Sequence, residues 1–178
     1  MQSFQMSTAG EEQWKKQPRI NSEFFSLTYG ALVQQILTDS EDITEVNQAL
    51  FGVGQYIGSR LVDELFAKAQ PPPCSNVKDT AEVICKVGFK MFFGFAPNWT
   101  QAGEKEFTLT FDQNPMIDFV ELPDDMRELN YCNALCGVVV GALDAVGIDA
   151  ECLITQDPLK GGKSNEFRVI LKGSKKPT

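Results

Sequence analysis

Apolar residues in the first half of the chain recur every three to four residues, the spacing that one face of an α-helix requires. Asn21 or Ser22 can cap a first helix, which should end at an acidic turn. A second helix should begin about Asp42 to Glu45, a variant of the capping box, and run to the prolines at 71–73. The pattern therefore predicts a long helical hairpin.

Two further helices and two pairs of strands follow the hairpin. A third helix should start at Ser75 or Asn76, and its C-terminal half is apolar on two faces, which predicts burial nearly all round. After the third helix, apolar and polar residues alternate one by one, which is typical of strands. The remaining expected elements are strands at 107–111 and 116–122, a helix at about 128–146, and strands at 150–156 and 166–171.

Grouped helices, then a hairpin, a helix and a second hairpin indicate the α+β class. We expect a helical hairpin and two further helices packed on a small antiparallel sheet. A single domain should cover residues 21–172, with a mobile N-terminal tail at 1–20 and a short basic tail at 173–178.

Composition and charge narrow the class of protein. The 178 residues are 43% hydrophobic and 22% charged, as in soluble globular proteins. The net charge of −8 opposes a phosphate backbone, so we expect no nucleic-acid partner. The N-terminus lacks the charged and apolar segments of a secretory signal, which predicts a cytoplasmic location.

The sequence contains no histidine. Without imidazole there can be no Ser-His-Asp triad, no Cys-His pair and no histidine metal ligand. Five cysteines in a reducing compartment should be free thiols, since an odd number does not suit a complete disulfide framework. Four of them lie in apolar patterns without C-x-x-C spacing, namely Cys85, Cys132, Cys136 and Cys152. This setting favours packing in the core and predicts no metal site.

Cys74 has a different setting from the other four cysteines. It lies between three prolines and the expected cap of the third helix, where unpaired N–H groups and the positive end of the helix dipole favour a thiolate. A reactive thiol with no histidine suits a single modification better than repeated turnover, and thioester formation with an acyl chain is one such event. An unmodified bystander in a proline-rich loop is the alternative that spacing alone leaves open.

Six stretches carry a further signal: F-S-L-T-Y-G-A-L-V (25–33), G-S-R-L-V-D-E (58–64), C-S-N-V-K-D-T-A-E-V-I-C-K-V-G-F-K-M-F-F-G (74–94), N-P-M-I-D-F-V-E-L-P (114–123), Y-C-N-A-L-C-G-V-V-V-G-A-L (131–143) and D-P-L-K-G (157–161). In order and at compatible spacing over roughly 22–172, they resemble the acyl-carrying small-subunit family of the transport protein particle (TRAPP), the family of its core subunit three.

The resemblance implies a non-catalytic α+β subunit that pairs through its first helices, as a homodimer when isolated and with other TRAPP small subunits in the particle. It implies a role in tethering vesicles between endoplasmic reticulum and Golgi, where the chain would contact membranes only peripherally. It also implies that the assembled particle exchanges nucleotide on a Rab GTPase. The alternatives are a soluble fatty-acyl binding or transfer protein and an unmodified homodimeric scaffold.

The resemblance also assigns residues. The acylated cysteine of the family falls on Cys74, and the chain, a palmitate or similar, threads an apolar channel of the subunit itself. Small or apolar residues on the third and fourth helices are channel candidates: Ala81, Ile84, Gly88, Gly137 and Gly141. Gly54 and Gly58 could clear one helix face for the hairpin or for a dimer seam, and Arg60 and Asp63 could pair with each other or face a partner.

Overall fold

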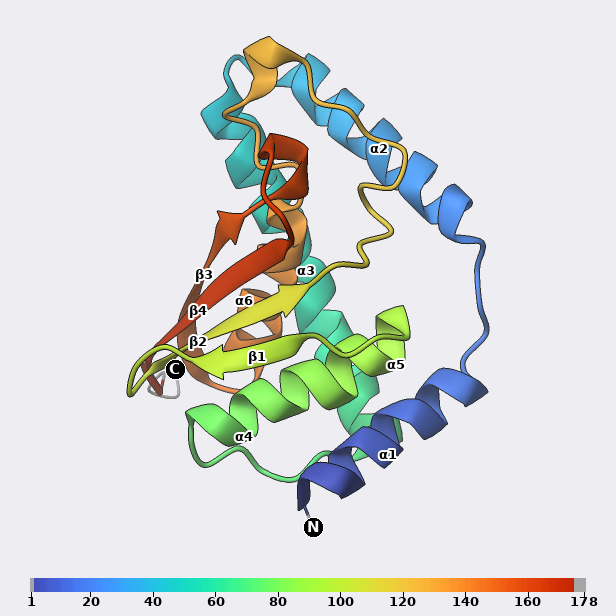
Figure 1. Ribbon diagram of the computed structural model, residues 1–178, viewed down its shortest axis with the longest axis vertical. Coiled ribbons are helices and arrows are strands. Elements are labelled where there is room, and N and C mark those ends of the chain that lie inside the picture. Colours follow the sequence, from blue (N-terminus) through green and yellow to red (C-terminus); the bar gives the residue numbers. More distant parts are fainter. Residues whose placement is uncertain (1, 175–178) are drawn as a thin grey trace.

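In the computed structural model, which describes residues 2–174, a four-stranded antiparallel sheet covers one side of a group of helices (Figure 1). This arrangement confirms the expected α+β class. The elements are α1 (Gln2–Lys16), α2 (Ser22–Asp39), α3 (Ile43–Ala69), α4 (Val77–Glu82), the π-helix η1 (Val83–Phe89), α5 (Lys90–Phe93), β1 (Asn98–Gln101), β2 (Glu106–Phe111), η2 (Asp124–Met126), α6 (Asn133–Ala145), β3 (Ile148–Gln156), η3 (Pro158–Lys160) and β4 (Asn165–Ser174).

Short polar side chains fix the starts of three helices. Asn21, Asp42 and Asn76 cap α2, α3 and α4, each by accepting a hydrogen bond from the backbone N–H three residues further on, at 3.1, 2.9 and 2.9 Å. The expected helix starts are therefore confirmed. Gln70, left-handed at φ 44°, ends α3 just before the prolines.

The sheet has the order β1-β2-β4-β3, with antiparallel neighbours throughout. The alternation in β2 was interpreted correctly, since Phe107, Leu109 and Phe111 are all buried against the helices. The strands expected at 150–156 and 166–171 correspond to β3 and β4, each longer than expected. β4 continues through Ser174, so the expected basic tail begins inside a strand, and its last four residues lie outside the described residues.

The strand expected at 116–122 is wrong. That segment forms turns, and β1, which lies outside the expected strands, is the neighbour that pairs with β2. The buried side chain of Asn114 explains the difference, because it accepts a hydrogen bond from the N–H of Met116 at 3.1 Å and donates one to Asn165 at 2.8 Å. These bonds turn the chain away from the sheet as soon as β2 has ended.

The expected helical hairpin is also less regular than predicted. α2 leaves α3 at the turn and diverges from it, while α3 packs closely on α6 (Figure 1). α2 is instead connected to the loop before α6: the Tyr29 hydroxyl donates to the carbonyl of Tyr131 at 2.5 Å, and the Ser26 hydroxyl donates to the carbonyl of Pro115. α6 itself starts later than expected, because residues before Asn133 form turns.

The N-terminal segment is a helix and not the expected mobile tail. α1 lies across α5 and the π-helix η1, and Met6 is only 3% exposed. Met6, Gly10 and Trp14 explain this, because their spacing of four places all three on one helix face. That face is short, so the sequence shows only a weak amphipathic pattern. None of the described helices is long and apolar enough to cross a membrane.

Candidate functional site

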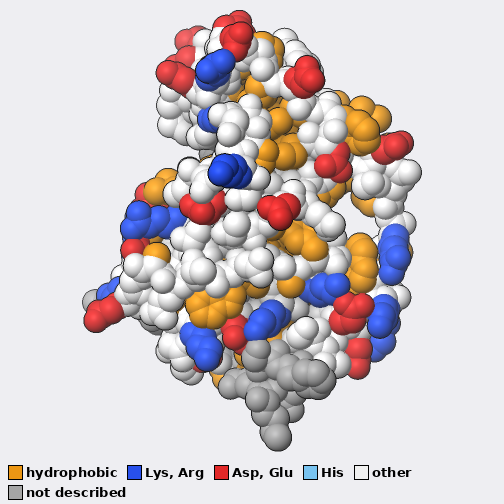
Figure 2. Space-filling model, viewed as in Figure 1, with side chains coloured by type: hydrophobic (Ala, Val, Ile, Leu, Met, Phe, Trp, Pro, Cys, Tyr) orange, Lys and Arg blue, Asp and Glu red, His pale blue; other side chains and the backbone are white. Residues whose placement is uncertain are grey.

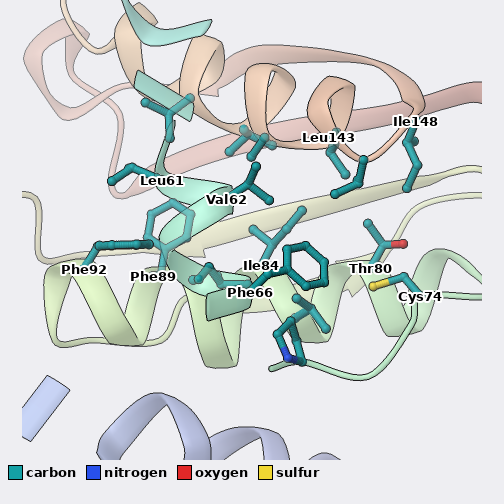
Figure 3. Close-up of a pocket in the computed structure, with 18 of the residues that line it drawn as sticks. Leu61, Val62, Phe66, Cys74, Thr80, Ile84, Phe89, Phe92, Leu143 and Ile148 are labelled. Atoms are coloured by element: carbon teal, nitrogen blue, oxygen red, sulfur yellow. The ribbon is translucent and has the colours of Figure 1, made fainter. Parts of the chain in front are cut away.

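An apolar cavity of about 490 Å³ lies between three helical segments, namely α3, the continuous stretch α4–η1–α5, and α6 (Figure 3). Its volume falls within the range of about 300–1,000 Å³ that is typical of small-molecule sites. The lining is almost entirely apolar and carries no charged side chain. Its residues are Leu61, Val62, Leu65, Phe66, the prolines at 71–73, Cys74, Thr80, Val83, Ile84, Gly88, Phe89, Phe92, Phe93, Leu135, Val138, Val139, Ala142, Leu143, Val146, Gly147 and Ile148.

The cavity exists because small residues and a widened helix keep side chains out of it. A Cβ added to Gly88 would meet nothing closer than Cδ1 of Leu65, at 3.6 Å, so the glycine leaves space beside the cavity. Seven consecutive residues form the π-helix η1, a type of helix that is wider than an α-helix, is rare and is frequently found at functional sites. The apolar side chains of this stretch face several neighbours: Ile84 lines the cavity, Val87 packs in one cluster with Met6 of α1, and Cys85 is part of the main core.

Cys74 lies at one end of the cavity. Its sulfur points toward the side chain of Thr80, while Leu61 and Phe92 lie at the opposite end (Figure 3). The residue as a whole is exposed, in the loop between the prolines and the cap of α4. The thiol therefore has access to solvent on one side and to an apolar cavity on the other.

The surroundings of Cys74 at the start of α4 do not favour the expected thiolate. Burial of the thiol raises the pKa of Cys74, a hydrogen bond with Thr80 lowers it, and the nearby carboxylate of Asp79 raises it; the net shift is upward. Two N–H groups near the thiol are already used, because Asn76 accepts from the N–H of Asp79 at 2.9 Å and Asp79 accepts from the N–H of Ser75 at 3.4 Å. The prediction of a lowered pKa is therefore wrong.

We expect alkylation of Cys74 to be slow at neutral pH. Only the thiolate reacts, and a raised pKa leaves less thiolate at any pH below it, so the rate should still be rising above pH ~8.5, the pKa of an ordinary thiol. The rate is measured by intact mass after timed treatment with iodoacetamide, beside a short cysteine peptide. A rate that levels off at lower pH than that of the peptide contradicts the raised pKa.

The structure brings together only part of the expected channel. Ile84 and Gly88 line the cavity with Cys74, whereas Ala81 is fully buried but is not part of the lining. Gly137 and Gly141 face α3 instead of the cavity. The small side chains predicted to make room in the channel at these two positions instead allow α3 to approach α6, so their predicted place in the channel is wrong.

Four glycines form the contact between α3 and α6. A Cβ added to Gly54 would lie 2.0 Å from the carbonyl oxygen of Ala134. A Cβ added to Gly58 would lie 2.1 Å from the carbonyl oxygen of Val138. On the facing helix, an added Cβ at Gly137 or Gly141 would lie 2.1 or 2.2 Å from a carbonyl oxygen of α3. Gly54 and Gly58 are therefore buried inside one chain, and their proposed use in the hairpin or in a dimer seam is wrong.

Arg60 and Asp63 are both exposed on α3, and none of the ion pairs among the described side chains joins them. The expectation that they face a partner stays a prediction.

Sequence reasoning missed most of the cavity. Two walls come from α3 and α6, including Val62, Phe66, Leu135 and Val139. The apolar residues of α6 on nearly every face were a usable signal, because a helix buried all round must be covered on all sides. The contribution of α3 could not be recognised before its packing partner was known.

The other four cysteines are buried, and no disulfide joins the described cysteines. Burial is the main cause that raises the pKa of Cys85 and of Cys132 to about 12. A thiol in this state is a poor nucleophile and a poor metal ligand. Within residues 2–174, no three acidic or cysteine side chains are grouped so as to hold a metal ion.

Comparisons with known proteins agree with this architecture. The family model described as Transport protein particle (TRAPP) component matches residues 25–170. The Trafficking protein particle complex subunit 3 of Dictyostelium discoideum is 47% identical over 166 residues, which cover 91% of this chain and 89% of the relative. The Trafficking protein particle complex subunit BET3 of Saccharomyces cerevisiae is 42% identical over 175 residues, which cover 96% and 91%.

A solved structure is similar in fold as well as in sequence. The crystal structure of a trafficking protein particle complex subunit 3 from Naegleria fowleri, covalently bound to palmitic acid, has a TM-score of 0.83 and 42% identity, covering 90% of this chain and 100% of that one. The fold and the cavity define an α+β protein with a cysteine thiol at one end of an apolar cavity. The chain belongs to the family of TRAPP components, as the sequence motifs predicted.

Proposed function

We propose that Cys74 is S-acylated and that its acyl chain, a palmitate or one of similar length, lies in the apolar cavity. The observation that supports this most is a thiol at one end of a cavity whose lining is otherwise nearly all apolar. Shelter of the chain is worth about 0.8 kcal/mol for each CH₂ removed from water. The crystallised relative is itself covalently bound to palmitic acid.

The modification needs no redox partner. The thiolate of Cys74 attacks the carbonyl carbon of an acyl-coenzyme A thioester, a new carbon–sulfur bond forms, and the bond to the coenzyme A sulfur breaks. Coenzyme A leaves as a thiolate and takes up the proton that Cys74 released. Because the raised pKa leaves little thiolate, this transfer suits a modification made once.

Filling the cavity with protein should prevent acylation without unfolding the chain. In Gly88→Leu the new side chain extends from the cavity wall into the space reserved for the acyl chain, and leucine also favours a helix more than glycine does, by about 0.8 kcal/mol. We expect at least a tenfold loss of palmitate incorporation from palmitoyl-coenzyme A, measured by intact mass.

Gly88→Ala is the matched control, because its Cβ fits at ordinary contact distance and leaves the cavity open. We expect it to be acylated like the unchanged chain. The proposal is contradicted if Gly88→Leu, folded by circular dichroism, is acylated as fast as Gly88→Ala.

A soluble acyl-binding or transfer protein is the alternative function for the same site. The two differ in turnover, because a structural acyl chain stays on the protein while a carrier releases it repeatedly. Incubation with excess palmitoyl-coenzyme A, with free acid measured over time and hydroxylamine used to confirm the thioester, distinguishes them. A stoichiometric thioester that persists supports the structural acyl chain, and repeated release of free acid supports the carrier.

We infer that the chain is a non-catalytic assembly subunit of a tethering complex that acts between endoplasmic reticulum and Golgi. In this proposal it lies on the cytoplasmic side, touches membranes peripherally, and supports nucleotide exchange on a Rab GTPase only within the complex. Two relatives are named as subunits of a trafficking complex, which supports the assembly role. Exchange catalysed by the isolated chain would contradict it.

Exposed apolar side chains support a proposed surface for neighbouring subunits. Phe24 and Leu27 of α2 are each 67% exposed, and Tyr56 of α3 is 80% exposed. Hydrophobic side chains reach the surface on the α2 side of the molecule (Figure 2). We propose that α2 and α3 pair with a second copy in isolation and with other small subunits in the complex, and a monomeric sedimentation profile would contradict this pairing.

A further inference from the structure

α1 lies behind the wall of the cavity. Met6, 3% exposed, packs in one cluster with Leu65, Val83 and Val87, and two of these, Leu65 and Val83, also line the cavity. The same side chains thus contact α1 on one side and the cavity on the other. α1 itself contributes no residue to the lining.

Direct contacts attach α1 to the helix that forms this wall. A Cβ added to Gly10 would lie 2.1 Å from the carbonyl oxygen of Lys86, so the two helix backbones touch. Glu11 forms an ion pair with Lys90 at 2.7 Å. The indole of Trp14 covers Gly94 at the end of α5, since a Cβ there would lie 2.5 Å from the ring.

A second set of contacts attaches α1 to α3. The side chain of Gln13 donates to the carbonyl of Lys68 at 2.9 Å, and the Lys68 ammonium donates to the Gln17 side chain at 3.0 Å. Gln17 in turn donates to Glu64 at 3.2 Å. α1 therefore bridges α3 and the α4–η1–α5 stretch, the two walls that the loop with Cys74 connects.

The docking of α1 is weak by comparison with the core. From residue 6 to residue 16, only Met6 and Gly10 are buried, and the other contacts are polar or half-exposed. Residues 18–21, which have no regular structure, link α1 to α2. Segments with few buried apolar contacts open locally at much lower cost than the whole fold.

We propose that α1 is a releasable brace on the cavity wall, and that its docking is coupled to filling of the cavity. This inference rests on the proposed function, because it concerns the chain that the cavity would hold. An occupant supports Leu65 and Val83 from inside and so stabilises the surface on which Met6 docks. The coupling is reciprocal: if filling favours docking by some factor, docking favours filling by the same factor.

The brace is tested first without an acyl chain. In Gly88→Leu the new side chain occupies the part of the cavity beside Leu65, so amide exchange of residues 2–16 should slow by about fivefold relative to unacylated Gly88→Ala, measured by hydrogen–deuterium exchange. Unchanged exchange in α1 overturns the brace, whether or not Cys74 is ever acylated. Absence of acylation in the unchanged chain would instead overturn the proposed function, so the two failures are distinct.

The second arm releases α1 from the wall. Gly10→Leu cannot dock, because its side chain would overlap the carbonyl of Lys86, while Glu12→Leu changes an exposed position of the same helix. On protein carrying palmitate at Cys74, we expect hydroxylamine to remove the chain about fivefold faster from Gly10→Leu than from Glu12→Leu. Equal rates of removal would show that α1 has no part in retaining the chain.

Discussion

Palmitoylation of Cys74 should raise the melting temperature of the isolated chain by about 6–12 °C. Burial of some twelve methylene groups at about 0.8 kcal/mol each sets an upper limit of roughly 10 kcal/mol. Even a third of that, about 3 kcal/mol, corresponds to this shift for a chain of this size. The stabilisation arises because the acyl chain makes van der Waals contacts with apolar side chains that otherwise face an empty cavity.

The comparison uses acylated protein, the same preparation after hydroxylamine, and Cys74→Ser. Hydroxylamine treatment should return the melting temperature to that of Cys74→Ser, since both then have an unfilled cavity. Equal melting of all three samples would mean that the chain is not sheltered inside the protein.

The second large effect concerns the contact between α3 and α6. Gly54→Ala should lower the free energy of unfolding by about 2–4 kcal/mol, because the new Cβ would lie 2.0 Å from the carbonyl oxygen of Ala134 and would push the two helices apart. Since α6 also forms one wall of the cavity, acylation at Cys74 should fall as well. Urea unfolding followed by circular dichroism measures the change in stability.

Gly52→Ala is the control for this experiment, two residues away on the same helix. A Cβ at Gly52 meets nothing within 4 Å, so the substitution should raise stability by up to about 1 kcal/mol through helix propensity alone. Both substitutions replace glycine by alanine, but they should change the free energy of unfolding in opposite directions. Similar effects from both would show that α3 and α6 are not in close contact at Gly54.

The sequence was most informative where a single residue decides local structure. Asn21, Asp42 and Asn76 predicted where three helices begin, because capping depends on one side chain and one nearby N–H. The spacing of Gly54 and Gly58 predicted close approach of a helix. The identity of that helix depends on contacts between residues about 80 positions apart, which no local pattern contains.

The errors have physical causes of the same kind. α1 was missed because its docking face, Met6, Gly10 and Trp14, contains only one buried apolar side chain, Met6. So few apolar positions do not make a strong periodic pattern. The strand expected at 116–122 failed because the buried amide of Asn114 directs the chain elsewhere. Cys74 differs from the other four cysteines in being exposed. The sign of its pKa shift depends on burial of the thiol, which the sequence does not report.

The proposed function requires an acyl chain that is attached to Cys74 and held inside the protein. The most direct measurement is intact mass spectrometry with peptide mapping of the chain after treatment with palmitoyl-coenzyme A, beside Cys74→Ser. We predict one acyl group per chain, located on Cys74, removed by hydroxylamine and absent from the variant. Acylation on another residue, or an unmodified chain under conditions that acylate a relative of this family, would contradict the proposed function.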